Sequence, residues 1–215
     1  MQLISQSFQD GQVIPGEFAF AVPDASSHVA LSSNRNPHLA WSDVPEGTRS
    51  FVVICHDPDV PSRGDDVNQE GREVPLSLPR VDFFHWVLLD IPADVSQIAA
   101  GSHSDGVTPG GKSGPATPEG WRHGLNDYTG WFAADEHMKG NYFGYDGPCP
   151  PWNDTRIHHY VFTVYALATL TLEVTGPLTG ANVRAALASA KVLGQASLTG
   201  VYSLNPAVSL QTGLR

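Results

Sequence analysis

The sequence has few basic residues and lacks any apolar run of transmembrane length. Its 215 residues include 12 Lys and Arg against 22 Asp and Glu, which gives a formal net charge of −10. Nucleic acids and anionic membrane surfaces bind proteins through basic patches, so this balance argues against either as the main partner. The first 16 residues also lack the basic and apolar segments of a secretory signal. We therefore interpret the chain as a cytoplasmic protein that is not an integral membrane protein.

Cysteine is equally scarce. The two thiols differ in setting, because Cys55 ends an apolar run and Cys149 stands between two prolines. Two cysteines can form a disulfide, but free buried thiols are the more common state in a reducing compartment. We expect both cysteines to be free, and Cys149 to be an inert thiol in a loop.

The common hydrolase motifs are missing from the sequence. It contains neither a Gly-x-Ser-x-Gly elbow nor a Ser-x-x-Lys pair, so no serine nucleophile is indicated. No His-Glu-x-x-His run supports zinc hydrolysis. The sequence therefore predicts no catalytic residue, no metal ligand and no cofactor.

Composition and pattern together predict a mainly β protein. The 21 Gly and 17 Pro are typical of loop-rich β proteins, and 41% hydrophobic residues suffice for a real core. Buried strands are predicted where β-branched and aromatic residues crowd together, at residues 50–56, 83–92 and from His158 onward. One helix is predicted over residues 180–194, capped by Asn182. We expect an antiparallel β-sandwich in one domain spanning residues 1–215.

The remaining segments are short strands and long loops. Alternating patterns predict strands near residues 3–8, 18–22 and 39–41. Residues 62–79 are polar and are expected to form a surface insertion. Residues 93–142 are broken repeatedly by glycine, and an irregular run of this length is expected to be functional or to be packed by its own aromatic rings.

Polar side chains stand at the ends of the three predicted buried strands. Asp57 follows the first, His85 lies within the second, and His158 and Tyr160 begin the third. If these strands converge, the four side chains form one pocket. The turn at residues 147–148 would add backbone N–H groups, and protonated histidines would add charge, which together suit a phosphate group or another small anion. Such binding is expected to weaken as the histidines lose their proton.

Three separated motifs in the same order resemble the signatures of the phosphatidylethanolamine-binding proteins. They are DPDVP at residues 57–61, FHWVL at residues 84–88, and GP at residues 147–148 followed by HHY at residues 158–160. The weaker pattern NPHLAWSDVP at residues 36–45 also fits. The form GPCPP, the insertion at residues 62–79 and SDGV at residues 104–107 are similar to the bacterial Raf-kinase-inhibitor-like branch.

This resemblance implies a Greek-key sandwich of antiparallel sheets with one or two small C-terminal helices. It also implies a small anion pocket that takes a phosphate or a phospholipid head group, in a protein that could modulate a partner protein. Asp59 is expected to brace a loop rather than to touch the ligand. The ligand-binding residues implied or inferred in this way are Asp57, Phe83, His85, Gly147, Pro148, His158 and Tyr160.

Several of these residues also have a plain structural interpretation. Asp57 and Asp59 can stabilise a turn, and His85 can be a core histidine satisfied by a backbone carbonyl. Only one of His158 and His159 can enter the pocket, because adjacent strand residues face opposite ways. Trp121, Tyr128 and Trp131 are expected to pack the loop rather than to form a ligand cage. The alternative function is a hydrolase, with or without a metal, that uses Asp57, His85 and His158.

The sequence predicts a homodimer, because bacterial proteins that the chain resembles often pair and residues 93–142 are rich in aromatic rings that favour interface cores. Sedimentation equilibrium at micromolar concentration is expected to give twice the monomer mass of 23.1 kDa. A monomer mass at every concentration would refute the dimer. The substitution Trp131→Glu is expected to break it while leaving anion binding largely intact, because the interface is expected to lie outside the pocket.

Overall fold

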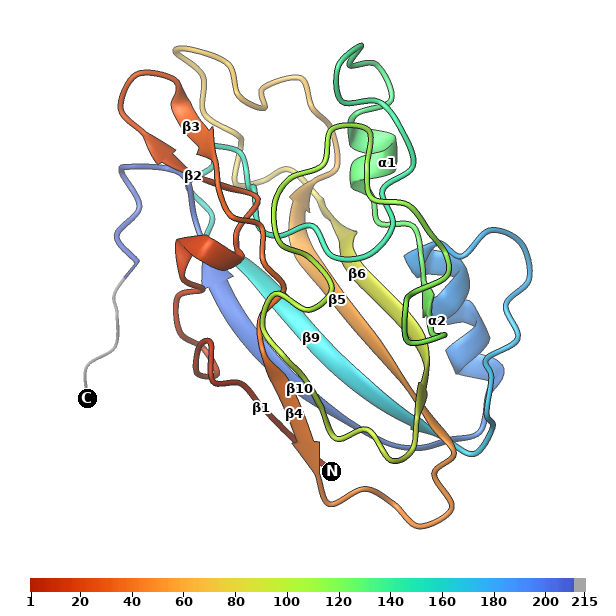
Figure 1. Ribbon diagram of the computed structural model, residues 1–215. Helices are drawn as coiled ribbons and strands as arrows, with labels where there is room; N and C mark the ends of the chain where they lie inside the picture. The colour runs from red at the N-terminus through yellow and green to blue at the C-terminus, as the bar shows by residue number, and fades with distance from the viewer. Residues whose placement is uncertain (211–215) are drawn as a thin grey trace.

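The structure is a computed structural model that describes residues 1–210 of the chain. Within those residues, short connections and long loops join strands, two α-helices and one 3-10 turn (Figure 1). In chain order the elements are β1 (Gln2–Ile4), η1 (Gly16–Phe18), β2 (Ala21–Asp24), β3 (His28–Leu31), β4 (Leu39–Ser42), β5 (Ser50–Pro61), β6 (Arg80–Pro92), β7 (Gln97–Ile98), β8 (Arg122–His123), α1 (Tyr128–Trp131), β9 (His158–Leu167), α2 (Gly180–Ser189) and β10 (Val192–Tyr202).

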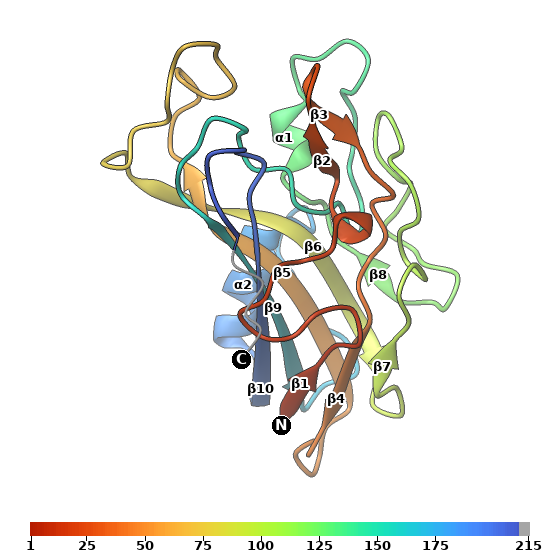
Figure 2. The same ribbon diagram turned by 90° about the vertical axis from the view of Figure 1, so that its left-hand side faces the viewer.

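The strands form two packed sheets and one hairpin, all with antiparallel pairing. The large sheet has the order β10-β9-β5-β6-β8, and the small sheet has the order β1-β4-β7. Figure 2 shows the small sheet on one side of the large sheet and α2 on the other side. Strands β2 and β3 pair only with each other. The prediction of a mainly β, antiparallel sandwich is therefore confirmed.

The central strand β5 is covered on both faces, which explains its unbroken apolar sequence. Residues 51–55 alternate between two clusters, since Phe51 and Val53 face the small sheet while Val52 and Ile54 face α2. A strand buried on both faces carries apolar residues at every position. Helix α2 closes the second face with Val183 and Leu187.

The helix prediction was right at its first residue, Gly180, and wrong in its capping residue and its C-terminal end. The N-cap is Thr179, whose hydroxyl accepts the N–H of Asn182, so Asn182 lies inside the helix. The helix ends at Ser189 because the chain turns back to start β10. Within residues 1–210, no helix combines the length and the apolar character needed to cross a membrane.

Two of the expected short strands were also wrong in detail. The expected strand at residues 18–22 is the end of η1 followed by the start of β2, and the strand at residues 3–8 is reduced to β1. The expected surface insertion at residues 62–79 is a loop that runs between β5 and β6. These differences lie where local pattern is weakest, because short segments depend on the neighbours with which they pair.

The strand β5 does not end at His56, as the sequence led us to expect, but continues to Pro61. Its pairing with β6 shifts register between Asp57 and Val60. Such a bulge is where a strand tolerates proline, because the ladder hydrogen bond is interrupted there. Asp57 therefore stands inside the sheet, paired with Phe83 across the strands.

The glycine-rich segment at residues 93–142 packs against its own chain. Tyr128 and Tyr142 are buried, and the ring of Phe132 lies 5.4 Å from that of Tyr142. Trp131 is the exception among these rings, because 51% of it is exposed. The homodimer stays a prediction, and its interface would have fewer rings available than the sequence indicated.

Candidate functional site

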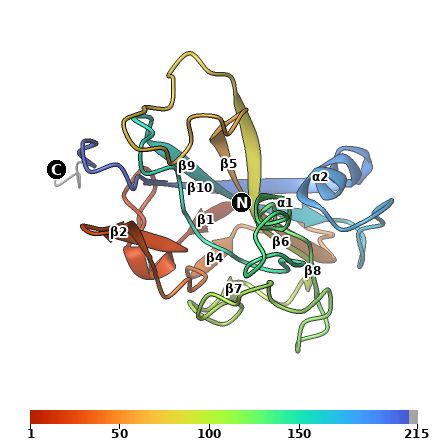
Figure 3. The ribbon, with the colours of Figure 1, turned by 90° about the horizontal axis from the view of Figure 1, so that it is seen from above.

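One cavity of about 370 Å³ opens at the end of the sandwich where the long loops gather. Figure 3 looks onto this end, with the β2–β3 hairpin, the loop at residues 62–79 and α1 arranged around it. The strands β5, β6 and β9 supply the inner end of the cavity. Five of the seven predicted site residues line it together: Asp57, Phe83, His85, His158 and Tyr160.

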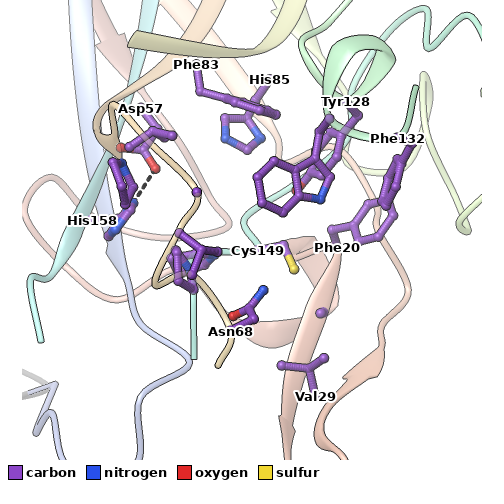
Figure 4. Close-up of a pocket in the computed structure, with 18 of the residues that line it drawn as sticks. Phe20, Val29, Asp57, Asn68, Phe83, His85, Tyr128, Phe132, Cys149 and His158 are labelled. Atoms are coloured by element: carbon purple, nitrogen blue, oxygen red, sulfur yellow. Dashed lines mark hydrogen bonds and ion pairs between the residues drawn. The ribbon is translucent and has the colours of Figure 1, made fainter. Parts of the chain in front are cut away.

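An imidazole held between two carboxylates forms the polar end of this cavity. His158 Nδ1 lies 2.6 Å from Asp57 Oδ2, and its Nε2 lies 3.1 Å from Asp154 Oδ2. All three side chains are buried, and Figure 4 shows the Asp57–His158 contact beside Phe83 and His85. Arg80 in turn forms an ion pair with Asp154. Because each carboxylate has a cationic partner, the cluster balances its own charge when His158 is protonated.

The surroundings of His158 favour its protonated form. Burial disfavours the charged ring, but the hydrogen bonds to Asp154 and Asp57 outweigh it and raise the pKa of His158 to about 9. Burial opposes the charge of Asp154 too, but the bonds from His158 and Arg80 lower the pKa of Asp154 to about 2. At neutral pH the imidazolium therefore directs both of its N–H groups to carboxylates and has none left for a ligand.

The second histidine is in the opposite state. His85 Nδ1 lies 2.8 Å from the carbonyl oxygen of Asp146, and because a carbonyl only accepts, Nδ1 carries the hydrogen. Burial lowers the pKa of His85, so the ring is neutral at pH 7 and Nε2 is an acceptor. His85 is thus both the satisfied core histidine and a residue of the cavity lining.

The carbonyl that orients His85 belongs to a residue that is itself held from three sides. Asp146 is buried, and its carboxylate accepts hydrogen bonds from Asn34, Asn126 and Lys112 at 2.7–2.8 Å. These contacts come from three loops that are distant in sequence. They fix the loop at residues 144–148 against β6 and thereby fix the ring of His85.

The hydroxyl of Tyr160 is the unsatisfied polar group of the cavity wall. It is buried and has no hydrogen-bond partner within residues 1–210. The Tyr160 ring stands edge-on to His85, with the ring centroids 5.1 Å apart. A buried hydroxyl without a partner costs free energy, and within the described residues this donor stays unused.

Gly147 and Pro148, by contrast, lie outside the cavity lining. The N–H of Gly147, which we expected to be available to an anion, donates to Asn34 Oδ1 at 2.8 Å. The carbonyl of Pro148 accepts the N–H of Phe20 at 2.9 Å. The turn therefore ties the loop to the N-terminal segment, and its expected anion-binding N–H is engaged elsewhere.

Asp59 and His159 pair with each other away from the cavity. Asp59 Oδ2 accepts the backbone N–H of His159 at 3.1 Å and lies 2.8 Å from His159 Nδ1. Neither residue is part of the lining. Asp59 thus braces the ends of β5 and β9 rather than the expected loop, and His158 is the one histidine of the pair that turns inward.

Most of the cavity wall is apolar and comes from segments that the sequence did not single out. Figure 4 shows Phe20, Tyr128 and Phe132 grouped across the cavity from Asp57 and His158. The interpretation of Tyr128 and Trp131 as loop packing was incomplete, since both line the cavity, whereas Trp121 does not. Trp131 therefore cannot serve as a probe of dimerisation that is independent of the cavity. Cys149 is free and also lines it.

Three walls of the cavity are fastened to one another by contacts outside it. His28 at the start of β3 stacks on Trp152, with centroids 3.8 Å apart and planes 5° apart, and its Nε2 lies 2.6 Å from Glu70. The backbone N–H of Asn68 donates to Asn153 Oδ1, and Asn153 Nδ2 donates to the carbonyl of Asp66. Asn68 Oδ1 accepts the N–H of Trp152, so these bonds join the loops at residues 62–79 and 147–157. The hairpin and both loops are thus held together around the cavity.

The alternative of a metal site finds no matching geometry in the described part of the chain. Within residues 1–210, no three His, Cys, Asp or Glu side chains are placed so that they could hold one metal ion. Asp57 and His158 instead face each other directly.

Comparison with known proteins agrees with this arrangement of motifs. Residues 4–203 match the family described as Phosphatidylethanolamine-binding protein. The chain belongs to this family. It is 32% identical to the Escherichia coli protein YbhB over 207 residues, which cover 94% of this chain and 100% of YbhB. It is 33% identical to E. coli YbcL over 90% of this chain and 87% of YbcL.

The solved structures of the bacterial branch share the fold. The crystal structure of E. coli YbcL, described as a new member of the mammalian PEBP family, superposes with a TM-score of 0.65 at 28% identity. The match covers 94% of this chain and 97% of YbcL. The chain is thus a phosphatidylethanolamine-binding protein family member of the bacterial YbhB/YbcL branch.

The raised pKa of His158 predicts how the stability of this family member depends on pH. The folded state binds the proton more tightly than an unfolded histidine of pKa 6.5, so this contribution is fully present below pH 6.5 and is lost as pH rises toward 9. The free energy of unfolding should fall by about 1.4 kcal/mol for each pH unit that separates the folded and unfolded pKa values of this histidine. Urea denaturation at pH 6.5, 8 and 9.5 measures it.

Two variants give this prediction its control. Asp154→Asn removes one of the two carboxylates that hold His158. The variant should be less stable than the unmodified protein, and its stability should begin to fall at a lower pH as the pH is raised. His137→Gln changes an exposed histidine and should follow the unmodified protein. A stability that does not change between pH 6.5 and 9.5 would contradict the prediction.

Proposed function

We propose that this protein binds a small amphiphilic molecule through a phosphate or similar anionic head group. The observation that carries the proposal is the unpartnered, buried hydroxyl of Tyr160 beside His85 at the polar end of a cavity whose lining is mostly apolar. Ligand cavities typically have apolar walls and a few polar groups that orient the ligand. An acceptor oxygen of a phosphate would satisfy the hydroxyl.

His85 adds to the affinity for an anion by taking up a proton. Its Nδ1 is already bound to a carbonyl, so protonation places a new N–H on Nε2, the nitrogen left for the ligand. Burial opposes that charge in the free protein and lowers the pKa of the ring, and a neighbouring anion would compensate for it. The ring is therefore neutral in the free site and is expected to become charged when an anion binds.

The arrangement favours binding over hydrolysis. The ring nitrogens of His158 are both engaged with carboxylates, which leaves it neither a lone pair for a base nor a free N–H for an acid. Within the described residues, His85 is the one imidazole of the lining with an uncommitted nitrogen, and the sequence motifs supply no nucleophile for it to activate. We propose no catalytic role for Asp57, His85 or His158.

Replacement of Tyr160 by Phe tests the proposal. Because the lost hydrogen bond would be to a charged group, phosphate binding should weaken about 10- to 100-fold. The stability of the variant should stay equal or rise, since the deleted hydroxyl has no partner in the described chain. Isothermal titration with inorganic phosphate at pH 6 and thermal denaturation measure the two effects.

The matched control is Tyr145→Phe. Its hydroxyl donates to the carbonyl of Phe18 at 2.6 Å and lies outside the cavity lining. This variant should lose about 1–3 kcal/mol of stability and keep its phosphate affinity. Equal phosphate affinity in the Tyr160 variant and the unmodified protein would refute the assigned role of the hydroxyl.

The apolar walls predict that affinity rises with the length of an alkyl chain on the phosphate. The cavity has room for roughly a dozen water molecules, which is far more than a phosphate group fills. Each buried methylene contributes about 0.8 kcal/mol, or about a fourfold tighter Kd. Titration with ethyl, butyl and hexyl phosphate measures this increment.

The increment should shrink in Phe132→Ala, which removes part of the wall. It should be unchanged in Leu170→Ala, which alters an exposed side chain away from the cavity. The same affinity for all three alkyl phosphates would show that the apolar walls do not take part in binding.

A further inference from the structure

The hydrogen-bonding groups at the polar end of the cavity are mostly used by one another. His158 gives one N–H to Asp57 and one to Asp154. Arg80 bonds to Asp154 and to the carbonyl of Asp59, and it is not part of the lining. Neither cation therefore presents a free donor to the cavity, although both are within the polar cluster.

Asp57 is left as a carboxylate that faces the cavity. Its Oδ1 accepts the N–H of Asp59 at 2.7 Å, and its Oδ2 accepts the N–H of His158 at 2.6 Å. A carboxylate has about four acceptor positions, so two remain. A bound anion would thus meet the carboxylate of Asp57, which can only accept hydrogen bonds, next to the hydroxyl of Tyr160, which can donate one.

This combination constrains the chemistry of the head group. An anion that carries no hydrogen would place its oxygens against the carboxylate of Asp57 with no hydrogen bond between them. Contact between like charges of this kind is strongly unfavourable. An anion with one acidic hydrogen would donate it to Asp57 while its other oxygens accept from Tyr160 and His85. Only an anion with an acidic hydrogen therefore satisfies both the acceptor, Asp57, and the donors, Tyr160 and His85.

We propose that Asp57 makes this site select phosphomonoesters that carry a proton on the phosphate over sulfate esters and other anions without one. The inference rests on the proposed function and adds the class of head group. A phosphomonoester loses its second proton with a pKa of about 6, whereas a sulfate ester has no proton to lose. Asp57 therefore acts as a specificity-determining residue and not only as the partner of His158.

Several titratable groups surround Asp57, and their titration must be distinguished from that of the ligand phosphate. The pKa of His158 is raised to about 9 and that of Cys149 to about 12, so neither titrates between pH 5.5 and 7.5. Burial lowers the pKa of His85 and of His56 below 6.5, so both histidines are considered in the pH profile. The remaining titratable groups around Asp57 are Cys55, Asp59, Tyr128, Asp154 and Tyr160.

Phenyl phosphate and phenyl sulfate form a matched pair of probes for the unmodified protein. At pH 5.5 both are mainly monoanions of nearly the same shape, and they differ by one hydrogen. A site built to accept a ligand hydrogen rejects the analogue without it, so phenyl phosphate should bind at least roughly 100-fold more tightly in isothermal titration. Equal affinities at pH 5.5 would overturn the selection by Asp57.

The pH profile separates the proton of the ligand from those of the histidines. Above pH 6 the affinity for phenyl phosphate should fall about tenfold per pH unit as its monoanion is depleted. Phenyl sulfate keeps its charge, so any pH dependence of its binding reports His85 and His56 alone. Parallel profiles for the two probes would refute the inference, whereas failure of phenyl phosphate to bind at all would refute the proposed function itself.

Two variants locate the selection on one carboxylate. Asp57→Asn introduces an amide that can donate, so the preference for phenyl phosphate over phenyl sulfate should drop to within about tenfold. Asp90→Asn removes the same charge from a carboxylate that pairs with Arg122 outside the lining, and should keep the preference. A preference that persists in Asp57→Asn would overturn the proposal, and if that variant does not fold, the two probes on the unmodified protein still decide it.

Discussion

The antiparallel pairing of β5 with β6 on one side and β9 on the other is the constraint on which the rest of the structure depends. It places Asp57 opposite Phe83, and it brings the start of β9 beside the same end of β5. Residues separated by more than a hundred positions, such as Asp57 and His158, thereby become neighbours. The bulge after Asp57 lets the strand continue through two prolines, so that the carboxylate is fixed by the sheet rather than carried on a loop.

Charge balance makes this placement tolerable. Buried carboxylates are costly unless a partner compensates for them, and here the imidazolium of His158 lies between Asp57 and Asp154 while Arg80 pairs with Asp154. The same compensation determines which groups remain for a ligand. His158, which the sequence led us to expect at the ligand, instead holds Asp57 and Asp154. The hydroxyl of Tyr160 and the Nε2 of His85 are the polar atoms beside them that are left without a protein partner in the described residues.

The apolar part of the cavity depends on the loops rather than on the sheets. The hairpin and α1 are short, and the loop at residues 62–79 contains no helix or strand. Their positions come from specific contacts such as the stack of His28 on Trp152. Asp146 has the same role on the other side, since three loops donate to its buried carboxylate. Membership of the phosphatidylethanolamine-binding protein family accounts for the motifs, and these contacts account for how this chain arranges them.

The sequence by itself determined the fold class and most of the polar cluster. The central parts of strands β5, β6 and β9 are buried and mostly apolar, which local pattern records well. The separated motifs that contain Asp57, His85 and His158 follow a family order. It did not reveal Asp154, although the four-residue spacing to His158 was a signal, because an acid in a proline-rich loop has no predictable partner. It also misjudged Gly147, Tyr128 and Trp131. Only the tertiary structure decided which N–H groups are already bonded and which rings face a cavity, because both depend on segments that are distant in sequence and on the loops that bring them together.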